Sequence, residues 1–256
     1  MQENKDERLR KVKSILVTLP KPETEKSPYF DLAKKYNLRI DFRSFIHVEG
    51  VPAKDFRKEK INLADFTAVV FTSRNAVDHF FRICEEMRFE VSVNLKYFCI
   101  SESTALYLQK YIQYRKRKIF FGKQTAADLA EVLKKHATEK FLYPCSDEAT
   151  EDTMNFLQKN GYDGTPAILF ITVVSDLSDL ADVFYDVLAF FSPSSIQSLY
   201  INFPNFLQNN TRIATFGLNT QKAVADKGLI VDIAAPNPEA PSMIMALENY
   251  IKKSNK

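Results

Sequence analysis

Short, uninterrupted apolar runs that lead through polar residues into helical periodicity recur along this chain. The clearest run covers residues 68–71 and passes through Thr72 and Ser73 into a stretch where apolar residues recur at helical spacing as far as Cys84. A continuous apolar run of this length predicts a strand buried on both faces, as in a parallel sheet covered by helices. Ser73 or Asn75 is placed to cap the helix that follows.

The same pattern predicts alternating strands and helices from residue 14 onward. Ser27 is expected to cap the first helix, with Pro28 at its first position and Asn37 near its end. We expect strands at 14–20, 68–71, 95–101, 117–121, 140–146, 188–191, 212–217 and 229–234, and helices at 28–36, 55–63, 76–84, 103–111, 124–133, 154–161, 177–187, 194–203, 219–228 and 243–253.

Two stretches of the chain repeat each other. Residues 188–196 match residues 68–77 about 119 positions later, with Ser192 matching Ser73, and residues 214–220 match residues 98–104 at an offset of 116. Residues 231–247 parallel 119–133, and the first unit, 15–37, parallels 141–161. The repeat predicts an α/β protein of two similar doubly wound parallel-sheet domains, flavodoxin-like in architecture.

The order of the repeats makes one of these domains discontinuous. The outer domain is expected to take 13–37 and 176–256, and the inserted domain 52–164. Residues 38–51 and 165–175 alternate or are rich in β-formers, and we expect them to cross between the domains as an exposed, two-stranded antiparallel hinge. Residues 1–12 read as a polar N-terminal tail.

The composition excludes several classes of protein. The chain has 45% hydrophobic and 26% charged residues, as ordinary soluble proteins do, and its net charge of +3 is too weak to indicate nucleic-acid binding. No apolar run approaches the roughly 20 residues of a membrane span, and the charged start lacks the core of a signal peptide. We therefore expect a cytoplasmic protein that binds no membrane.

Metal and cofactor motifs are missing from the sequence. The three cysteines and three histidines are scattered, with no Cys-x-x-Cys spacing, so neither a disulfide framework nor a metal site is expected. With six glycines and no glycine-rich phosphate loop, the chain gives no support to a nucleotide cofactor. We predict no cofactor.

The predicted domains would place equivalent polar loops on the two sides of a cleft. Such loops lie at the carboxyl ends of parallel strands, where helix N-termini favour anions. They lack a nucleophile–base pair and suit an oxygen-rich anion, although any one hydroxyl can equally be a helix cap. The loop residues are Thr18, Ser73, Arg74, Asn75, Ser101, Thr104, Lys123, Thr125, Ser146, Ser192, Ser194, Ser195, Asn219 and Thr220.

Several of these motifs resemble those of the uroporphyrinogen-III synthase family. They lie at 71–77, 144–146, 169–173, 190–195 and 216–224, and the resemblance extends from residue 15 to residue 247. It implies a cofactor-free lyase of haem and tetrapyrrole synthesis. Such an enzyme cyclises hydroxymethylbilane with loss of water and inversion of ring D. The resemblance also implies a monomer in transient contact with the deaminase that makes this substrate.

The resemblance assigns roles to individual residues. It implies that Ser73, Thr104, Ser192 and Thr220 are cleft hydroxyls, with Ser192 and Thr220 the catalytic candidates and Thr220 nearest the reacting ring. The remaining loop residues and Phe170 would bind substrate, with Arg74 and Lys123 pairing with carboxylates. The family usually has a tyrosine at the position of Phe170, which assists departure of the hydroxyl. Phenylalanine has no O–H, so that role is absent here or falls to another group, such as Tyr143 or a bound water.

Two other functions are compatible with the same sequence. A non-catalytic two-domain module could bind an anionic tetrapyrrole or another metabolite through the same loops. Binding of a flavin or nucleotide follows from fold analogy alone.

Overall fold

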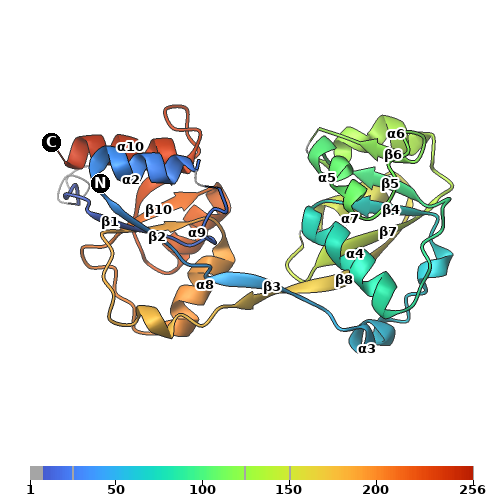
Figure 1. Ribbon diagram of the computed structural model, residues 1–256, viewed down its shortest axis with the longest axis horizontal. Coiled ribbons are helices and arrows are strands. Elements are labelled where there is room, and N and C mark those ends of the chain that lie inside the picture. Colours follow the sequence, from blue (N-terminus) through green and yellow to red (C-terminus); the bar gives the residue numbers. More distant parts are fainter. Residues whose placement is uncertain (1–7, 25, 124, 150, 256) are drawn as a thin grey trace. The chain divides into compact units, whose positions relative to one another are not determined.

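The structure is a computed structural model that describes residues 8–24, 26–123, 125–149 and 151–255 (Figure 1). The chain divides into two compact units. Unit 1 contains the residues up to His47 and those from Val173 onward, and unit 2 contains Val48–Thr172. Each unit has its own sheet and its own hydrophobic core.

Unit 1 is a parallel sheet of five strands in the order β11-β10-β9-β1-β2. Helices α2 and α10 cover one face, and α8 and α9 cover the other (Figure 1). The elements are β1 (Ser14–Val17), α2 (Pro28–Tyr36), β2 (Arg39–Phe42), η5 (Ser178–Leu180), β9 (Val187–Phe190), α8 (Pro193–Asn202), β10 (Arg212–Phe216), α9 (Leu218–Asp226), β11 (Val231–Ala235) and α10 (Met243–Ser254).

Unit 2 is built on a six-stranded sheet in the order β3-β8-β7-β4-β5-β6. Helices α4 and α5 pack on one face, and α6 and α7 pack on the other. The elements are β3 (Ile46–Gly50), α3 (Ala53–Phe56), η1 (Arg57–Glu59), η2 (Leu63–Asp65), β4 (Ala68–Phe71), α4 (Arg74–Glu86), β5 (Lys96–Cys99), α5 (Glu102–Tyr107), η3 (Leu108–Lys110), β6 (Ile119–Phe121), η4 (Ala126–Leu129), α6 (Ala130–Lys134), β7 (Lys140–Ser146), α7 (Asp152–Lys159) and β8 (Asp163–Val174).

The two sheets have the same strand order once the repeat is taken into account. The order β8-β7-β4-β5-β6 in unit 2 corresponds to β2-β1-β9-β10-β11 in unit 1. The register agrees, because Phe71 pairs with Cys99 in unit 2 and the equivalent Phe190 pairs with Thr215 in unit 1. The prediction of two similar α/β domains, with the first unit of the chain completing the outer one, is confirmed.

Local signals in the sequence account for how the helices begin and end. The Ser27 hydroxyl accepts from the Tyr29 N–H, Pro28 is the first helical residue, and Asn37 ends α2 with a left-handed φ of 51°. Ser73 and Ser192 cap α4 and α8, as expected from their matching positions. These three caps confirm the predicted helix starts.

The expectation that residues 38–51 form only an exposed crossing was wrong. Residues 39–42 are strand β2, which pairs in parallel with β1 from Ser14↔Arg39 to Val17↔Phe42. Its counterpart β8 likewise pairs in parallel with β7 before it continues beside β3. The Val51 N–H donates to the Leu169 carbonyl, and the Ser175 N–H to that of Phe45, so β3 and β8 are antiparallel. The predicted antiparallel pair is therefore shorter than expected.

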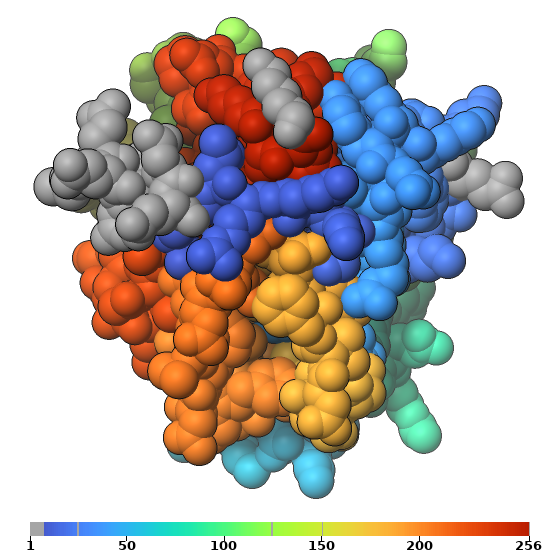
Figure 2. All heavy atoms as spheres, turned by 90° about the vertical axis from the view of Figure 1, so that its left-hand side faces the viewer, coloured from blue at the N-terminus to red at the C-terminus, as the bar shows by residue number. Residues whose placement is uncertain are grey.

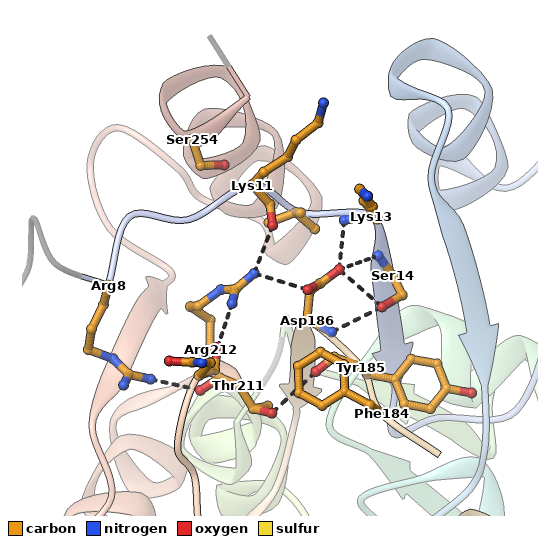
Figure 3. Close-up of polar contacts among 12 residues, drawn as sticks. Arg8, Lys11, Lys13, Ser14, Phe184, Tyr185, Asp186, Thr211, Arg212 and Ser254 are labelled. Atoms are coloured by element: carbon orange, nitrogen blue, oxygen red, sulfur yellow. Dashed lines mark hydrogen bonds and ion pairs between the residues drawn. The ribbon is translucent and has the colours of Figure 1, made fainter.

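The prediction that residues 1–12 form a polar tail is also wrong for residues 8–12. Residues 1–7 lie outside the described residues. Arg8 binds Asp232 at 2.5 Å, and Val12 is buried in the core of unit 1. Asp186 accepts from the N–H of Lys13 at 2.8 Å. Buried Arg212 donates to the Lys11 carbonyl, and both contacts can be followed in Figure 3. Figure 2 shows this segment, in blue, crossing below α10.

The helix expected at 177–187 does not form. Only η5 is helical there, and the chain then runs as a loop into β9. Leu177 and Tyr185 are buried beside Phe45, so the apolar spacing that predicted a helix instead reflects a loop packed against the sheet.

Candidate functional site

Unit 2 has a cavity of about 470 Å³ at the carboxyl ends of its strands. The chain adds β5 and β6 on one side of β4 and then returns to add β7 on the other, so the strand order reverses between β4 and β7. Ligands of open α/β sheets bind at the carboxyl edge beside such a reversal. The ends of β4 and β7, with the start of α7, line this cavity.

Four of the predicted site residues line the cavity, namely Ser73, Thr125, Ser146 and Phe170. The Ser73 hydroxyl accepts from the Ala76 N–H at 3.1 Å, and that of Thr125 donates to Asp128 at 2.9 Å. Both are thus helix caps as well as lining groups. Ser146 has no hydrogen-bond partner for its hydroxyl among the described residues.

Arg74 is exposed at the start of α4, outside the cavity lining. The Arg74 guanidinium lies 5.3 Å from the centroid of the Tyr107 ring. Asp78, one turn along, is occupied by Tyr107, Lys110 and Tyr111. Partial burial raises the pKa of Asp78, but these hydrogen bonds outweigh it and hold the pKa below its usual value. Arg74 therefore has no carboxylate partner among the described side chains.

The other predicted residues of unit 2 do not line the cavity. Asn75 is exposed on the first turn of α4, and Lys123 is exposed with no ion pair to a described residue. The hydroxyls of Ser101 and Thr104 lie 3.0 Å apart, with Ser101 capping α5 and Thr104 buried. These residues lie at the same carboxyl edge because each follows a parallel strand of the sheet.

The corresponding strand reversal in unit 1 lies between β1 and β9. The Thr18 hydroxyl, predicted to bind substrate, is buried and donates to the Ala189 carbonyl at 2.9 Å, so it ties β1 to β9. Ser192 caps α8, and its hydroxyl lies 2.9 Å from that of Ser195. Ser194 is half-buried in the first turn of the same helix.

The turn after β10 carries the remaining predicted residues of unit 1. Thr220 is buried, and its hydroxyl has no hydrogen-bond partner in the described part of the chain, whereas Asn219 is exposed. Beside them Leu218 is 80% exposed, and Phe216 stacks on Phe191 with centroids 6.3 Å apart. This edge therefore combines hydroxyl and amide groups with apolar surface.

The cavity residues that sequence reasoning missed include Thr153 and Asp152, and it gave Tyr143 only as an alternative. Thr153 and Asp152 begin α7 and line the cavity, and Tyr143 reaches it from β7. The sequence contained part of the signal for Asp152 and Thr153. In an open α/β sheet, ligands bind beside the strands where the strand order reverses, and the first residues of the helix that follows such a strand are expected there. That Tyr143 faces the α7 side depends on the side-chain alternation of β7.

The described residues contain no group of three or more His, Cys, Asp or Glu side chains that could hold a metal ion. Within the same residues no helix has both the length and the apolar character needed to span a membrane.

A second cavity, of about 500 Å³, lies in unit 1 at the opposite, amino-terminal edge of the sheet. Its walls include Leu180, Phe184, Phe203 and Leu207, from the segments that appear gold and orange in Figure 2. It contains none of the predicted site residues, and parallel sheets bind their ligands at the other edge.

Comparison with known proteins identifies the family. The family model described as uroporphyrinogen-III synthase HemD matches residues 29–245. The chain belongs to this family. This match confirms the prediction, made from the sequence, that the chain is a lyase of tetrapyrrole synthesis that acts on a small molecule.

Solved uroporphyrinogen-III synthases share the fold. The enzyme of Helicobacter pylori is 18% identical, with a TM-score of 0.62 over 94% of this chain and 99% of that chain. A mutant of the Thermus thermophilus enzyme is 14% identical, with a TM-score of 0.56 over the same shares. A search of curated protein sequences gave no significant match.

Proposed function

We propose that this chain is an active uroporphyrinogen-III synthase that cyclises hydroxymethylbilane with loss of water and inversion of ring D. The observation that carries the proposal is the family match over residues 29–245. The site chemistry supports it, because helix N-termini, hydroxyls and unpaired cations at the carboxyl edges suit a substrate with eight carboxylates.

The enzyme's task in this reaction is chiefly conformational. The free substrate is flexible and closes without inversion, so the protein must hold one conformer in which the last ring is attacked at its substituted carbon. Arg74 and Lys123 bind carboxylates, and Ser73, Thr104 and Ser192 donate hydrogen bonds to the substrate. Leu218 and the stacked pair of Phe191 and Phe216 offer apolar contact to pyrrole rings.

Thr220 contacts the reacting ring in this proposal. Thr220 is a largely buried residue, and its hydroxyl has no partner among the described residues, so this hydroxyl is available to bind a ligand. The protein acts as a cytoplasmic monomer and receives its substrate from the deaminase that makes it.

The deciding experiment supplies the purified full chain with enzymatically generated hydroxymethylbilane and separates the porphyrin isomers after oxidation. We expect isomer III to predominate, and isomer I as the sole product would overturn the proposal. Binding of the tetrapyrrole without isomer III would indicate the non-catalytic module instead.

Removing the Thr220 hydroxyl tests the site. Thr220→Val should lower kcat/KM about 10- to 100-fold, since a hydrogen bond to a charged group is worth roughly 1.5–3 kcal/mol. The comparison is Thr104→Val, the equivalent residue of unit 2, which also binds substrate in this proposal; its loss should be smaller, because its hydroxyl already pairs with Ser101. An equal loss in both variants would contradict the special role of Thr220.

A further inference from the structure

The Arg82 side chain of α4 bonds to unit 2 at the place where β3 ends beside β8. Its Nη2 donates to the Val51 carbonyl at 2.9 Å and to the Leu169 carbonyl at 3.0 Å. The Leu169 carbonyl also accepts from the Val51 N–H at 2.9 Å. One guanidinium nitrogen therefore joins α4 both to β8 and to the residue that follows β3.

The other nitrogens of the same guanidinium are bonded within α4. Nε donates to His79 Nδ1 at 3.0 Å, and Nη1 forms an ion pair with Glu86. The second oxygen of Glu86 accepts from the Ala53 N–H at 3.0 Å. The donors of a guanidinium are held in one rigid plane, so partners on three of its nitrogens fix its orientation.

Gly50 leaves the space that the guanidinium occupies. A Cβ at Gly50 would lie 2.7 Å from Cζ and from Nε of Arg82. Gly50 is not among the described glycines with a positive φ, so its backbone conformation alone does not require glycine. The close approach of Arg82 is what a side chain at this position would prevent.

These contacts reach Phe170 by two routes. Leu169, whose carbonyl accepts from Arg82, directly precedes Phe170 in β8. The His79 ring, which also accepts from Arg82, stacks on the Phe170 ring with centroids 5.0 Å apart and planes 20° apart. Phe170 lines the cavity of unit 2, whereas Arg82 and His79 do not. Arg82 thus holds both the backbone before Phe170 and the ring beside it.

The bond to Arg82 also fixes the tautomer of His79. A guanidinium nitrogen can only donate, so Nδ1 of His79 is the acceptor and the proton of the neutral ring is on Nε2. The ring that stacks on Phe170 therefore keeps one orientation. Phenylalanine has no polar atom with which to fix its own ring, so its position depends on such neighbours.

We propose that Arg82 is a positioning residue of the reaction, which holds Phe170 as a fixed wall of the unit 2 cavity through His79 and the Leu169 carbonyl. This inference rests on the proposed function, in which the protein must hold one conformer of a flexible substrate. An aromatic wall selects a conformer only if the wall itself is fixed, because aromatic rings pack in defined relative orientations.

Arg82→Met tests the proposal, because it removes the guanidinium and keeps an unbranched side chain. We expect kcat for isomer III to fall about tenfold, since a small misplacement of bound substrate is costly in rate. KM should change less than about threefold, because the groups proposed to bind carboxylates are kept. The matched control is Arg57→Met, an exposed arginine of unit 2 whose side chain has no partner among the described residues. It should leave kcat unchanged.

Gly50→Ala displaces the guanidinium while Arg82 itself is kept. We expect kcat to fall about threefold or more in this variant. In the Arg82→Met background, Gly50→Ala should change kcat less than twofold, because its Cβ then meets no guanidinium. An equal loss with and without the guanidinium would place the effect in the backbone of β3 and overturn the proposal.

A double-mutant cycle with Phe170→Leu separates positioning from general stability. If Arg82 acts through the Phe170 ring, Arg82→Met should lower kcat less than about threefold once that ring is gone. A merely structural arginine would cost the same tenfold in both backgrounds, and this result would overturn the proposal.

The His79 tautomer gives a readout that needs neither activity nor a variant. The chain has three histidines, so the ring nitrogens of His79 can be assigned in long-range ¹H–¹⁵N spectra of the full chain. We expect the proton of the neutral ring on Nε2, and a mixture of tautomers in Arg82→Met. A proton on Nδ1 of the wild type would overturn the proposal, since Arg82 could not then donate to it.

The outcomes distinguish the inference from the proposed function. If wild type forms isomer III and folded Arg82→Met does so at the same kcat, the inference is overturned and the proposed function stands. If Arg82→Met raises KM and leaves kcat unchanged, Arg82 serves binding and the inference is again overturned. If wild type yields isomer I alone, the proposed function itself fails, and the inference that rests on it fails with it.

Discussion

The turn after the second strand of the repeat is built differently in the two units. In unit 2, Ser101 has a φ of −142° and caps α5 with its hydroxyl. In unit 1 the equivalent residue is Gly217, with a φ of +88°, and it caps α9 without a side chain. The next residue is polar Glu102 in one unit and exposed Leu218 in the other.

The buried parts of the same turns are alike. Thr104 and Thr220 are both buried, and the strands before them pair in the same register. The comparison teaches that the repeat has kept the residues that fix the sheet and the turn position. The exposed residues have diverged, so that the turn is polar in unit 2 and partly apolar in unit 1.

The largest expected effect tests whether the cores of the two units contribute equally to the free energy of unfolding. Phe71 and Phe190 are fully buried at matching positions of β4 and β9. Phe71→Ala and Phe190→Ala should each lower the free energy of unfolding by about 3–5 kcal/mol. Calorimetry should show that each variant lowers the transition of its own unit.

A surface variant provides the control for these two changes. Val93 is exposed in unit 2, so Val93→Ala should change the free energy of unfolding by less than about 0.5 kcal/mol. A single transition that moves equally in both phenylalanine variants would show that the two cores do not unfold separately.

The next effect concerns the two turns themselves. A Cβ at Gly217 would meet no atom within 4 Å, so Gly217→Ala is opposed by its left-handed backbone alone. We expect it to cost about 1–2 kcal/mol in chemical unfolding. Ser101→Ala should cost about 1 kcal/mol through the lost cap, and Ser101→Gly only a few tenths. If Gly217→Ala were neutral, the difference between the turns would not be one of backbone conformation.

The smallest effect is a pH dependence found beside Phe170. The His79 ring stacks on Phe170 with centroids 5.0 Å apart, and its Nδ1 accepts from the Arg82 Nε–H at 3.0 Å. Burial and the charge of Arg82 lower the pKa of His79, and the carboxylates of Asp78 and Glu86 offset this only in part.

The direction of the pH effect follows from this shift. Since the folded-state pKa lies below the unfolded value of 6.5, the unfolded chain binds the proton first as the pH falls. The contribution of neutral His79 to the free energy of unfolding is therefore complete above pH 6.5, and it is lost as the pH falls through the folded-state pKa. Between pH 7 and pH 5, wild type should lose more free energy of unfolding than His79→Gln, which keeps an acceptor for Arg82. Parallel slopes in denaturant titrations would refute this.

Much of the candidate site could be predicted, because its groups stand at strand ends and helix starts. Ser73 and Ser192 were found from a cap signal repeated at matching positions. Thr18 was found by the same logic, yet its hydroxyl bonds to the Ala189 carbonyl within the sheet. A sequence pattern locates a hydroxyl at a strand end, but the neighbouring strand decides whether that hydroxyl stays free.

The sequence by itself determined the buried strands, the helix caps and the repeat, because apolar continuity and capping act over a few residues. Only the tertiary structure decided that residues 39–42 join the sheet as β2, that Arg8 and Val12 belong to unit 1, and that Tyr143 meets Asp152 and Thr153 at one cavity. Those outcomes depend on contacts between segments far apart along the chain, and a local pattern carries no record of such partners.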